Sequence, residues 1–163
     1  MIKDSLVSLT KYNLWANTKL LHFIIEVGEE KADIIQNSSF LSIRETLYHI
    51  WGAETIWLNR LVSKPFTGWP GTNFKGTLKE AGELFLKISK DFVAFTEGKS
   101  EAEFNAIINY KNIEGKEFSN TISQIIIHCM NHSTFHRGQI ITMLRNAGFT
   151  NLSSTDYITF CRL

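Results

Sequence analysis

The chain has 163 residues, of which 44% are hydrophobic and 20% are charged. This length suits one domain with a sizeable core, and this composition excludes disorder over most of the chain. Seventeen basic and sixteen acidic side chains give a formal charge of +1, so neither a nucleic acid nor an anionic membrane is an expected partner. We also find no apolar run as long as a membrane span, no signal peptide and only two cysteines, and therefore expect a cytoplasmic protein.

Four segments have the apolar periodicity of amphipathic helices. They run from about Lys3 to Val27, from Ser42 to Val62, from Thr77 to Gly98 and from Thr121 to Ala147. The last three begin with a capping-box pattern, in which Ser or Thr is followed three residues later by Glu or Gln. Gly28, Gly98 and Gly148 are the expected stops, with Gly98 in the left-handed conformation.

The segments between these helices have different characters. Glu29–Ser39 is a polar connection, and Lys64–Gly76 holds both prolines and three glycines, which predicts a long crossover loop with Phe66, Trp69 and Phe74 as anchors. Phe104–Phe118 predicts a short β-hairpin, and the tail after Gly148 is apolar enough to pack against the body. We therefore predict an all-α, four-helix bundle that forms one domain over residues 1–163.

Three of the five histidines, His128, His132 and His136, are spaced four residues apart in the last predicted helix. This spacing places them on one face, but His128 and His136 are separated by roughly 12 Å along the axis, too far to share one small ion. One adjacent pair can chelate a metal, and spacing leaves open which pair. Three imidazoles would suit zinc, nickel, copper or iron.

A third ligand must then come from another helix. His49 is the better candidate because it lies mid-helix, next to Gly52, where a neighbouring group can come close. His22 is more typical of a histidine at a helix C-terminus. A zinc protease of the HExxH type is excluded because Ser133 and Cys129 stand where its glutamate would be.

The segment Asn131-His-Ser-Thr-Phe-His-Arg-Gly-Gln139 resembles the signature of the DinB-like (DinB/YfiT) superfamily. Segments in both halves of the chain are similar to the same family: Tyr12-Asn-Leu-Trp-Ala-Asn17, Leu47-Tyr-His-Ile-Trp-Gly-Ala-Glu-Thr-Ile-Trp-Leu58 and Asp156-Tyr-Ile-Thr-Phe160. The resemblance implies a four-helix bundle with a divalent ion on His49, His132 and His136. It also implies zinc, nickel or another divalent metal, and a homodimer.

Other polar and aromatic residues are candidates for supporting roles. Glu54 lies about 140° around the helix from His49, so we expect it to pair with Arg137 or to orient a ligand rather than to bind the ion. His128 is a candidate neighbour of the site, and Tyr12 and Trp51 are candidate pocket walls, although aromatic residues at helical spacing usually belong to the core. Gly138 predicts a close helix–helix contact there.

Two functions follow from these patterns. The first is a metal-dependent enzyme acting on a small molecule, either as a transferase that uses a small thiol cosubstrate, as the resemblance implies for some relatives, or as a hydrolase. No general base stands beside the histidines in the sequence, which favours delivery of a thiolate. The second is a non-catalytic metal-binding module of a stress response.

Overall fold

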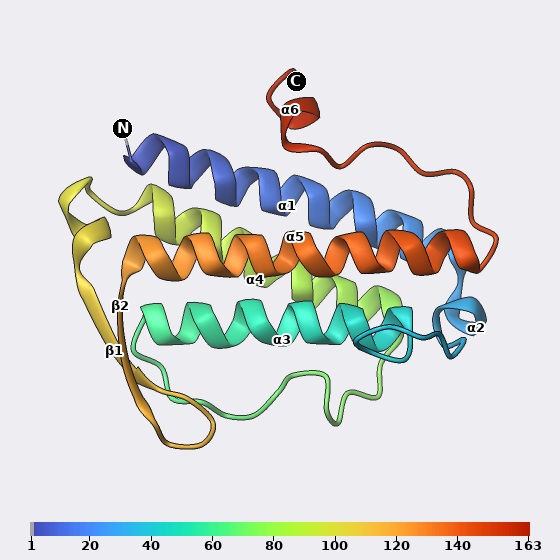
Figure 1. The fold of residues 1–163 in the computed structure, drawn as a ribbon, viewed down its shortest axis with the longest axis horizontal. Coiled ribbons are helices and arrows are strands. Elements are labelled where there is room, and N and C mark those ends of the chain that lie inside the picture. The colour runs from blue at the N-terminus through green and yellow to red at the C-terminus, as the bar shows by residue number, and fades with distance from the viewer. Residues whose placement is uncertain (1) are drawn as a thin grey trace.

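The computed structural model describes residues 2–163 and shows the predicted four long helices (Figure 1). They are α1 (Ile2–Val27), α3 (Ile43–Leu61), α4 (Leu78–Glu97) and α5 (Ile122–Asn146). Contacts join α1 to α4 and α5, and α3 to α4 and α5, so the four helices close into a bundle. The predicted all-α, four-helix-bundle fold is confirmed.

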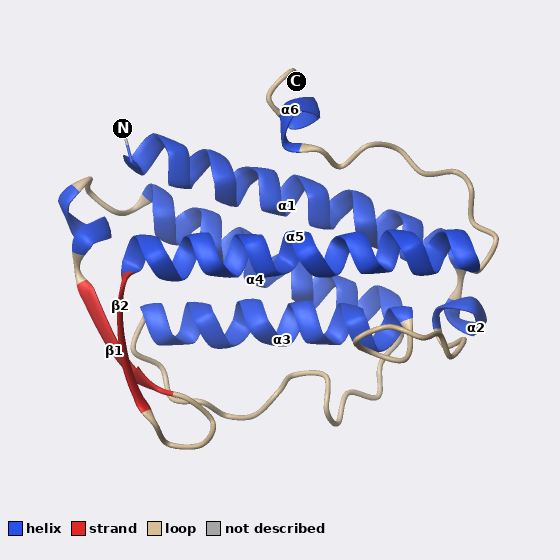
Figure 2. Cartoon of the chain, in the orientation of Figure 1, coloured by secondary structure: helices blue, strands red, loops and turns tan. Residues whose placement is uncertain are grey.

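The direction of the helices explains the long loop. Followed by colour in Figure 1, α3 and α4 run the same way, whereas α1 and α5 run the opposite way. Two parallel helices need a connection that returns along their whole length, and residues 62–77 make it as a continuous loop (Figure 2). The predicted crossover therefore lies along one side of α3.

Smaller elements complete the chain. A 3₁₀-helix, η1 (Ala102–Asn105), leads into the predicted hairpin, in which β1 (Ile107–Lys111) pairs antiparallel with β2 (Glu117–Thr121). The tail forms α6 (Tyr157–Phe160) and packs back as expected, with the Tyr157 and Phe160 rings against Tyr12. The segment predicted as a purely polar connection contains one short helix, α2 (Glu29–Ala32), whose Ala32 is buried.

The helix caps agree with the sequence in most places. Both capping boxes that begin with threonine, at Thr77 and Thr121, form completely. Ser42 also accepts a hydrogen bond from the Glu45 amide, but the Glu45 carboxylate accepts from the amide of Leu41. At the start of α3, the glutamate therefore accepts from the amide of the residue before the N-cap, and not from the N-cap amide as in a complete capping box.

Three expectations about single positions are wrong. Gly98 has a φ of −73°, because its amide still bonds to the Ala94 carbonyl and continues the helical pattern. The apolar periodicity of residues 77–98 also predicts an inward position for Leu84, but Leu84 is 43% exposed, because it lies beyond the edge of the stripe formed by Ala81 and Phe85. Gly138 meets no neighbour, since its position on α5 is exposed.

The core consists of two apolar clusters separated by polar residues. From α3, one cluster contains Ile43, Leu47, Ile50 and Trp51, and the other contains Leu58 and Leu61. Between them, every long helix contributes buried polar side chains, namely Asn13, Asn17, Glu54, Ser89, Ser133 and Arg137. We call these six residues the polar layer.

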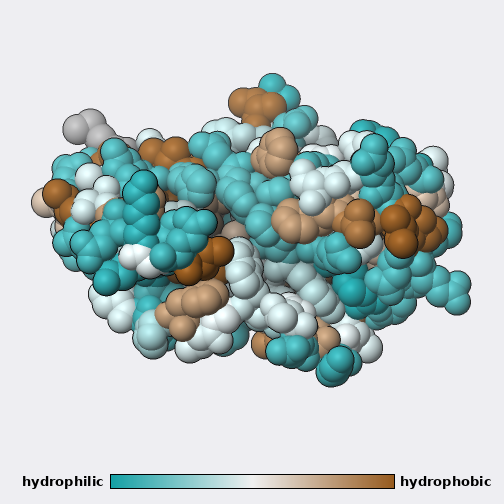
Figure 3. Space-filling model, turned by 60° about the horizontal axis from the view of Figure 1, so that its bottom comes forward, coloured by the Kyte–Doolittle hydropathy of each residue, from teal (hydrophilic) through white to brown (hydrophobic). Residues whose placement is uncertain are grey.

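The outer surface is mixed. On the face shown in Figure 3, hydrophobic residues form small groups separated by hydrophilic ones. None of the described helices is long and apolar enough to cross a membrane.

Candidate metal centre

Three histidines from two helices converge on the side of the bundle where α3 meets α5. His49 comes from α3, and His132 and His136 come from successive turns of α5. One ring nitrogen from each lies within 4.8 Å of the others, and Nε2 of His49 is 2.9 Å from Nε2 of His132. A set of three nitrogen donors this close suits one small metal ion.

The other two histidines lie outside this cluster. His22 is exposed on α1, 3.8 Å from the carboxylate of Glu26. The His128 ring lies 6.1 Å from that of His132, centroid to centroid, and packs edge-on against Trp57. The structure thus brings together the pair at 132 and 136, and leaves His128 as a neighbour.

Burial keeps these imidazoles neutral, which is the form that binds a metal. Desolvation, and then the nearby His136, lower the pKa of His49 to about 4. Desolvation and the surrounding histidines likewise lower the pKa of His132 to about 4, and desolvation lowers the pKa of His136. A neutral ring offers a lone pair at neutral pH, so the donors need not lose a proton to a metal.

Gln139 fixes the orientation of His136. Its Oε1 lies 2.7 Å from Nδ1 of His136, while its Nε2 donates to Oγ of Ser39 at 2.8 Å. This contact occupies Nδ1 and leaves Nε2 of His136 free for ligation. From the sequence alone, Gln139 is expected to make a hydrogen bond that packs helices together, and its position three residues after His136, on the same helix face, is also a signal for the contact with that ring.

The hydrogen bonds around the three histidines leave one ring nitrogen of His132 without a partner. Its Nδ1 is the one buried side-chain polar atom of residues 2–163 without a hydrogen-bond partner. Buried polar groups nearly always have partners, and exceptions are typical of functional sites. Two neutral rings facing each other through Nε2, with an unpartnered nitrogen behind one of them, fit a site built for a cation.

Aromatic side chains cover the histidines from outside the helices. Phe40 stacks on His49 with ring centroids 4.2 Å apart, and Trp69 of the crossover loop also stacks on His49, with ring centroids 5.8 Å apart. Gly52 permits this approach, because a Cβ there would overlap the Trp69 ring. Phe40 was missed in the sequence, since it lies in an irregular segment far from any periodic pattern.

A cavity of about 470 Å³ opens beside His49. Phe40, Tyr48 and Trp69 supply its aromatic surface, and Glu45 supplies a carboxylate. Glu45 precedes His49 by one helical turn, a spacing that could have drawn attention to it. The site thus joins three nitrogen donors to a partly apolar cavity that contains one acidic group.

The polar layer lies directly behind the histidines. Ser133 follows His132 in the chain, and its hydroxyl donates to Oε1 of Glu54 at 2.9 Å. Arg137 follows His136 and is 2% exposed. The predicted direct pairing of Glu54 with Arg137 does not occur among the described contacts, because Asn13 and Asn17 stand between them.

The remaining candidates lie away from the histidines. Tyr12 packs under the Arg137 guanidinium, 5.4 Å from ring centroid to Cζ, and Trp51 belongs to the apolar core. Neither lines the cavity beside His49. Cys129 is buried, and desolvation raises the pKa of its thiol, which excludes a thiolate nucleophile there.

The fold and the cluster define a class: a four-helix bundle with three convergent histidines on two neighbouring helices. The sequence model of the DinB family matches residues 1–162, and the chain belongs to this family. It is 28% identical to Protein DinB of Bacillus subtilis (strain 168) over 165 residues, covering 96% of this chain and 93% of that protein.

A solved structure shows the same fold. The crystal structure of a DinB-like protein from Bacillus cereus ATCC 10987 matches with a TM-score of 0.67 and 19% identity, over 88% of this chain and 91% of that one.

Proposed function

We propose that this protein binds one divalent metal ion through His49, His132 and His136 and uses it to act on a small molecule. The convergence of three ring nitrogens within 4.8 Å carries the proposal. Membership of the DinB family and the neutral state favoured for these buried rings support it. Three protein ligands leave a coordination position for a substrate, as catalytic metal sites require.

The protein's own residues have distinct roles in this proposal. The three histidines hold the ion, Gln139 orients His136, and the rings of Phe40 and Trp69 limit the access of water. A bound divalent ion would lower the pKa of a thiol or polarise a carbonyl. The cavity beside His49 receives the substrate.

Transfer of a small thiol is the chemistry we favour. Its cosubstrate would enter the cavity with the thiol directed at the histidines, and the aromatic walls would exclude competing water. Hydrolysis is the second candidate, because the Glu45 carboxylate lines the same cavity and is the group there suited to accept a proton from water.

Metal analysis of protein purified without a histidine tag tests the site. We expect about one divalent ion per chain, lost in His49→Ala, His132→Ala and His136→Ala variants. His22→Ala is the matched control, because it removes an exposed histidine on α1. Full metal content in any of the three site variants would overturn the assignment.

An activity screen then separates an enzyme from a binding module. The metal-loaded protein is incubated with small thiols and a panel of electrophiles, and with esters and amides, with and without a chelator. Chelator-sensitive conjugation supports transfer, and hydrolysis that is lost in Glu45→Gln supports the second candidate. Stoichiometric metal without turnover in any arm would favour a non-catalytic stress-response module.

A further inference from the structure

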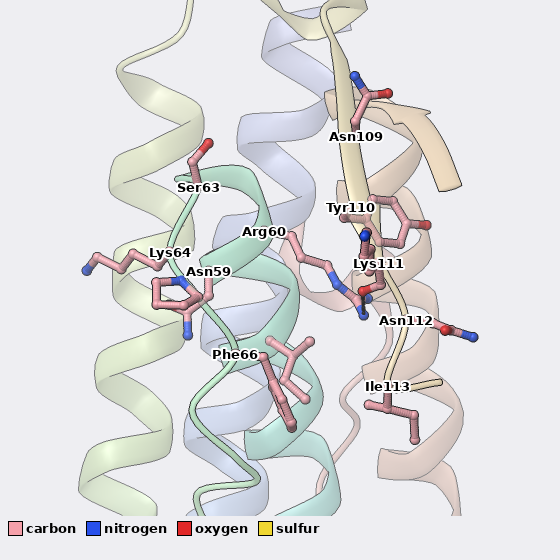
Figure 4. Close-up of a pocket in the computed structure, with 12 residues that line it drawn as sticks. Asn59, Arg60, Ser63, Lys64, Phe66, Asn109, Tyr110, Lys111, Asn112 and Ile113 are labelled. Carbon is pink, nitrogen blue, oxygen red and sulfur yellow. Dashed lines mark hydrogen bonds between the residues drawn. The ribbon is translucent and has the colours of Figure 1, made fainter. Parts of the chain in front are cut away.

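A second cavity, of about 510 Å³, lies at the C-terminal end of α3 (Figure 4). Its walls are the last turns of α3, the beginning of the crossover loop and strand β1 with the turn that follows. None of the histidines lines it, and Ile56, its lining residue nearest in sequence to His49, is roughly two helical turns farther along α3. It is therefore separate from the proposed metal centre.

Three basic residues line this cavity, Arg60, Lys64 and Lys111, and Arg60 is the one whose charged group contacts aromatic rings. Its guanidinium carbon lies 4.3 Å from the Trp57 ring centroid and 4.5 Å from that of Tyr110, so the group packs against both rings, which themselves meet edge to face. Figure 4 shows it directed from α3 toward Tyr110 and Lys111 of β1. One Nη2–H donates to the Lys111 carbonyl at 3.3 Å.

This arginine has no anionic partner among residues 2–163. No carboxylate lies within ion-pair distance of Arg60, and no acidic residue lines the cavity. Arg44 shows the contrast, since it pairs with both Glu29 and Asp33. A half-buried cation without a counter-ion is costly unless an anion is supplied from outside.

The surroundings of Arg60 add an apolar component. Phe66 of the crossover loop is 53% exposed and Ile113 of the hairpin turn is 71% exposed, and both line the cavity. Asn59, Asn109 and Asn112, which carry amide side chains, also line it. A ligand that fits has one anionic group and an apolar body.

We propose that this cavity binds a small organic anion, a phosphate monoester attached to an apolar group. The Arg60 guanidinium pairs with the anionic group through its remaining N–H donors, whose planar fork matches carboxylate and phosphate oxygens. Trp57 and Tyr110 hold the plane of the guanidinium before the ligand arrives. Phe66 and Ile113 contact the apolar body.

Isothermal titration calorimetry with phenyl phosphate, inorganic phosphate and phenol tests this. We expect saturable binding of phenyl phosphate, weaker binding of inorganic phosphate and none of phenol. Arg60→Gln should lower the affinity for phenyl phosphate about tenfold or more, and a tenfold change corresponds to about 1.4 kcal/mol of binding free energy. Arg145→Gln removes the same charge from an exposed position on α5 and is the matched control.

Phe66→Ala gives a second, independent variant, because Phe66 is exposed in a loop and its loss does not disturb the core. This variant should lower the affinity for phenyl phosphate and leave the affinity for inorganic phosphate unchanged. Circular dichroism confirms that each variant is folded. Equal affinity in Arg60→Gln and wild type, or no saturable binding of phenyl phosphate to wild type, would overturn the proposal. So would binding that a chelator abolishes, since that anion would occupy the metal centre.

Discussion

Glu54 and Arg137, two buried groups of opposite charge, are joined through asparagine side chains rather than directly. Glu54 is 0% exposed and Arg137 is 2% exposed. Asn13 and Asn17 each donate to Oε1 of Glu54 through Nδ2, at 2.8 and 2.9 Å, and each accepts from Nη1 of Arg137 through Oδ1. The two charges thus share a hydrogen-bonded layer that ties α1, α3 and α5 together.

The polar layer supplies the hydrogen-bond partners that the buried charges of Glu54 and Arg137 need. Burial lowers the pKa of Arg137, whereas Tyr12 and Glu54 oppose that shift. Buried ionic groups are retained only when their donors and acceptors are all satisfied. Because Ser133 and Arg137 follow His132 and His136 in the chain, the layer also fixes the rotation of α5 that directs both histidines toward α3.

Removal of the Glu54 carboxylate tests the importance of the layer for stability. Glu54→Ala leaves four donors without their acceptor and Arg137 without a nearby anion. We expect the free energy of unfolding to fall by about 3–5 kcal/mol, the range for breaking a buried pair. Urea denaturation measures this. Glu83→Ala, at an exposed position on α4, should change stability by less than about 0.5 kcal/mol; similar effects of both variants would contradict the layer's role.

The orientation of His136 by Gln139 predicts a change in metal affinity. Gln139→Ala removes the partner of Nδ1 while leaving all three proposed ligands in place. We expect divalent-metal affinity to fall by about 10–100-fold, as for other groups that orient a ligand. Competition with a chromogenic chelator measures the affinity. Asn131→Ala, an exposed change next to His132, should bind as wild type does.

The lowered pKa values of the histidines predict how the stability of the metal-free protein varies with pH. His49 and His132 have pKa values of about 4 when folded, against an ordinary value of 6.5, so the unfolded chain takes up protons first. The free energy of unfolding is therefore highest above pH 6.5 and falls as the pH drops from about 6.5 to about 4.

Chelator-treated protein, unfolded with urea at several pH values, provides the measurement. The double variant His49→Gln/His132→Gln should lose much of this decline, and His22→Gln should retain it. A decline of wild-type size in the double variant would assign the effect to other groups.

Two glycines with opposite surroundings give a paired prediction. Gly52→Ala places a Cβ against the Trp69 ring, so we expect it to destabilise the protein by about 1–3 kcal/mol and to displace Trp69 from His49. Gly138→Ala meets open space inside a helix and should stabilise by about 0.5–1 kcal/mol. Thermal unfolding and tryptophan fluorescence check both; equal melting temperatures would contradict the close packing at Gly52.

The sequence by itself determined the helices and the identity of the histidine cluster. Apolar periodicity and the capping pairs at Thr77 and Thr121 are local, so they could be read along the chain. The four-residue spacing restricted the chelating pair, and the family resemblance selected His49 with His132 and His136, the three that the structure brings together.

Only the tertiary structure decided what surrounds them. Phe40 and Trp69 reach His49 from irregular segments, where no periodicity indicates direction. The asparagines between Glu54 and Arg137 come from α1, and the partners of Arg60 come from a distant hairpin. These contacts depend on how whole helices pack, because packing decides which side chains meet across the core. Local sequence patterns do not show contacts between residues that are far apart in the chain.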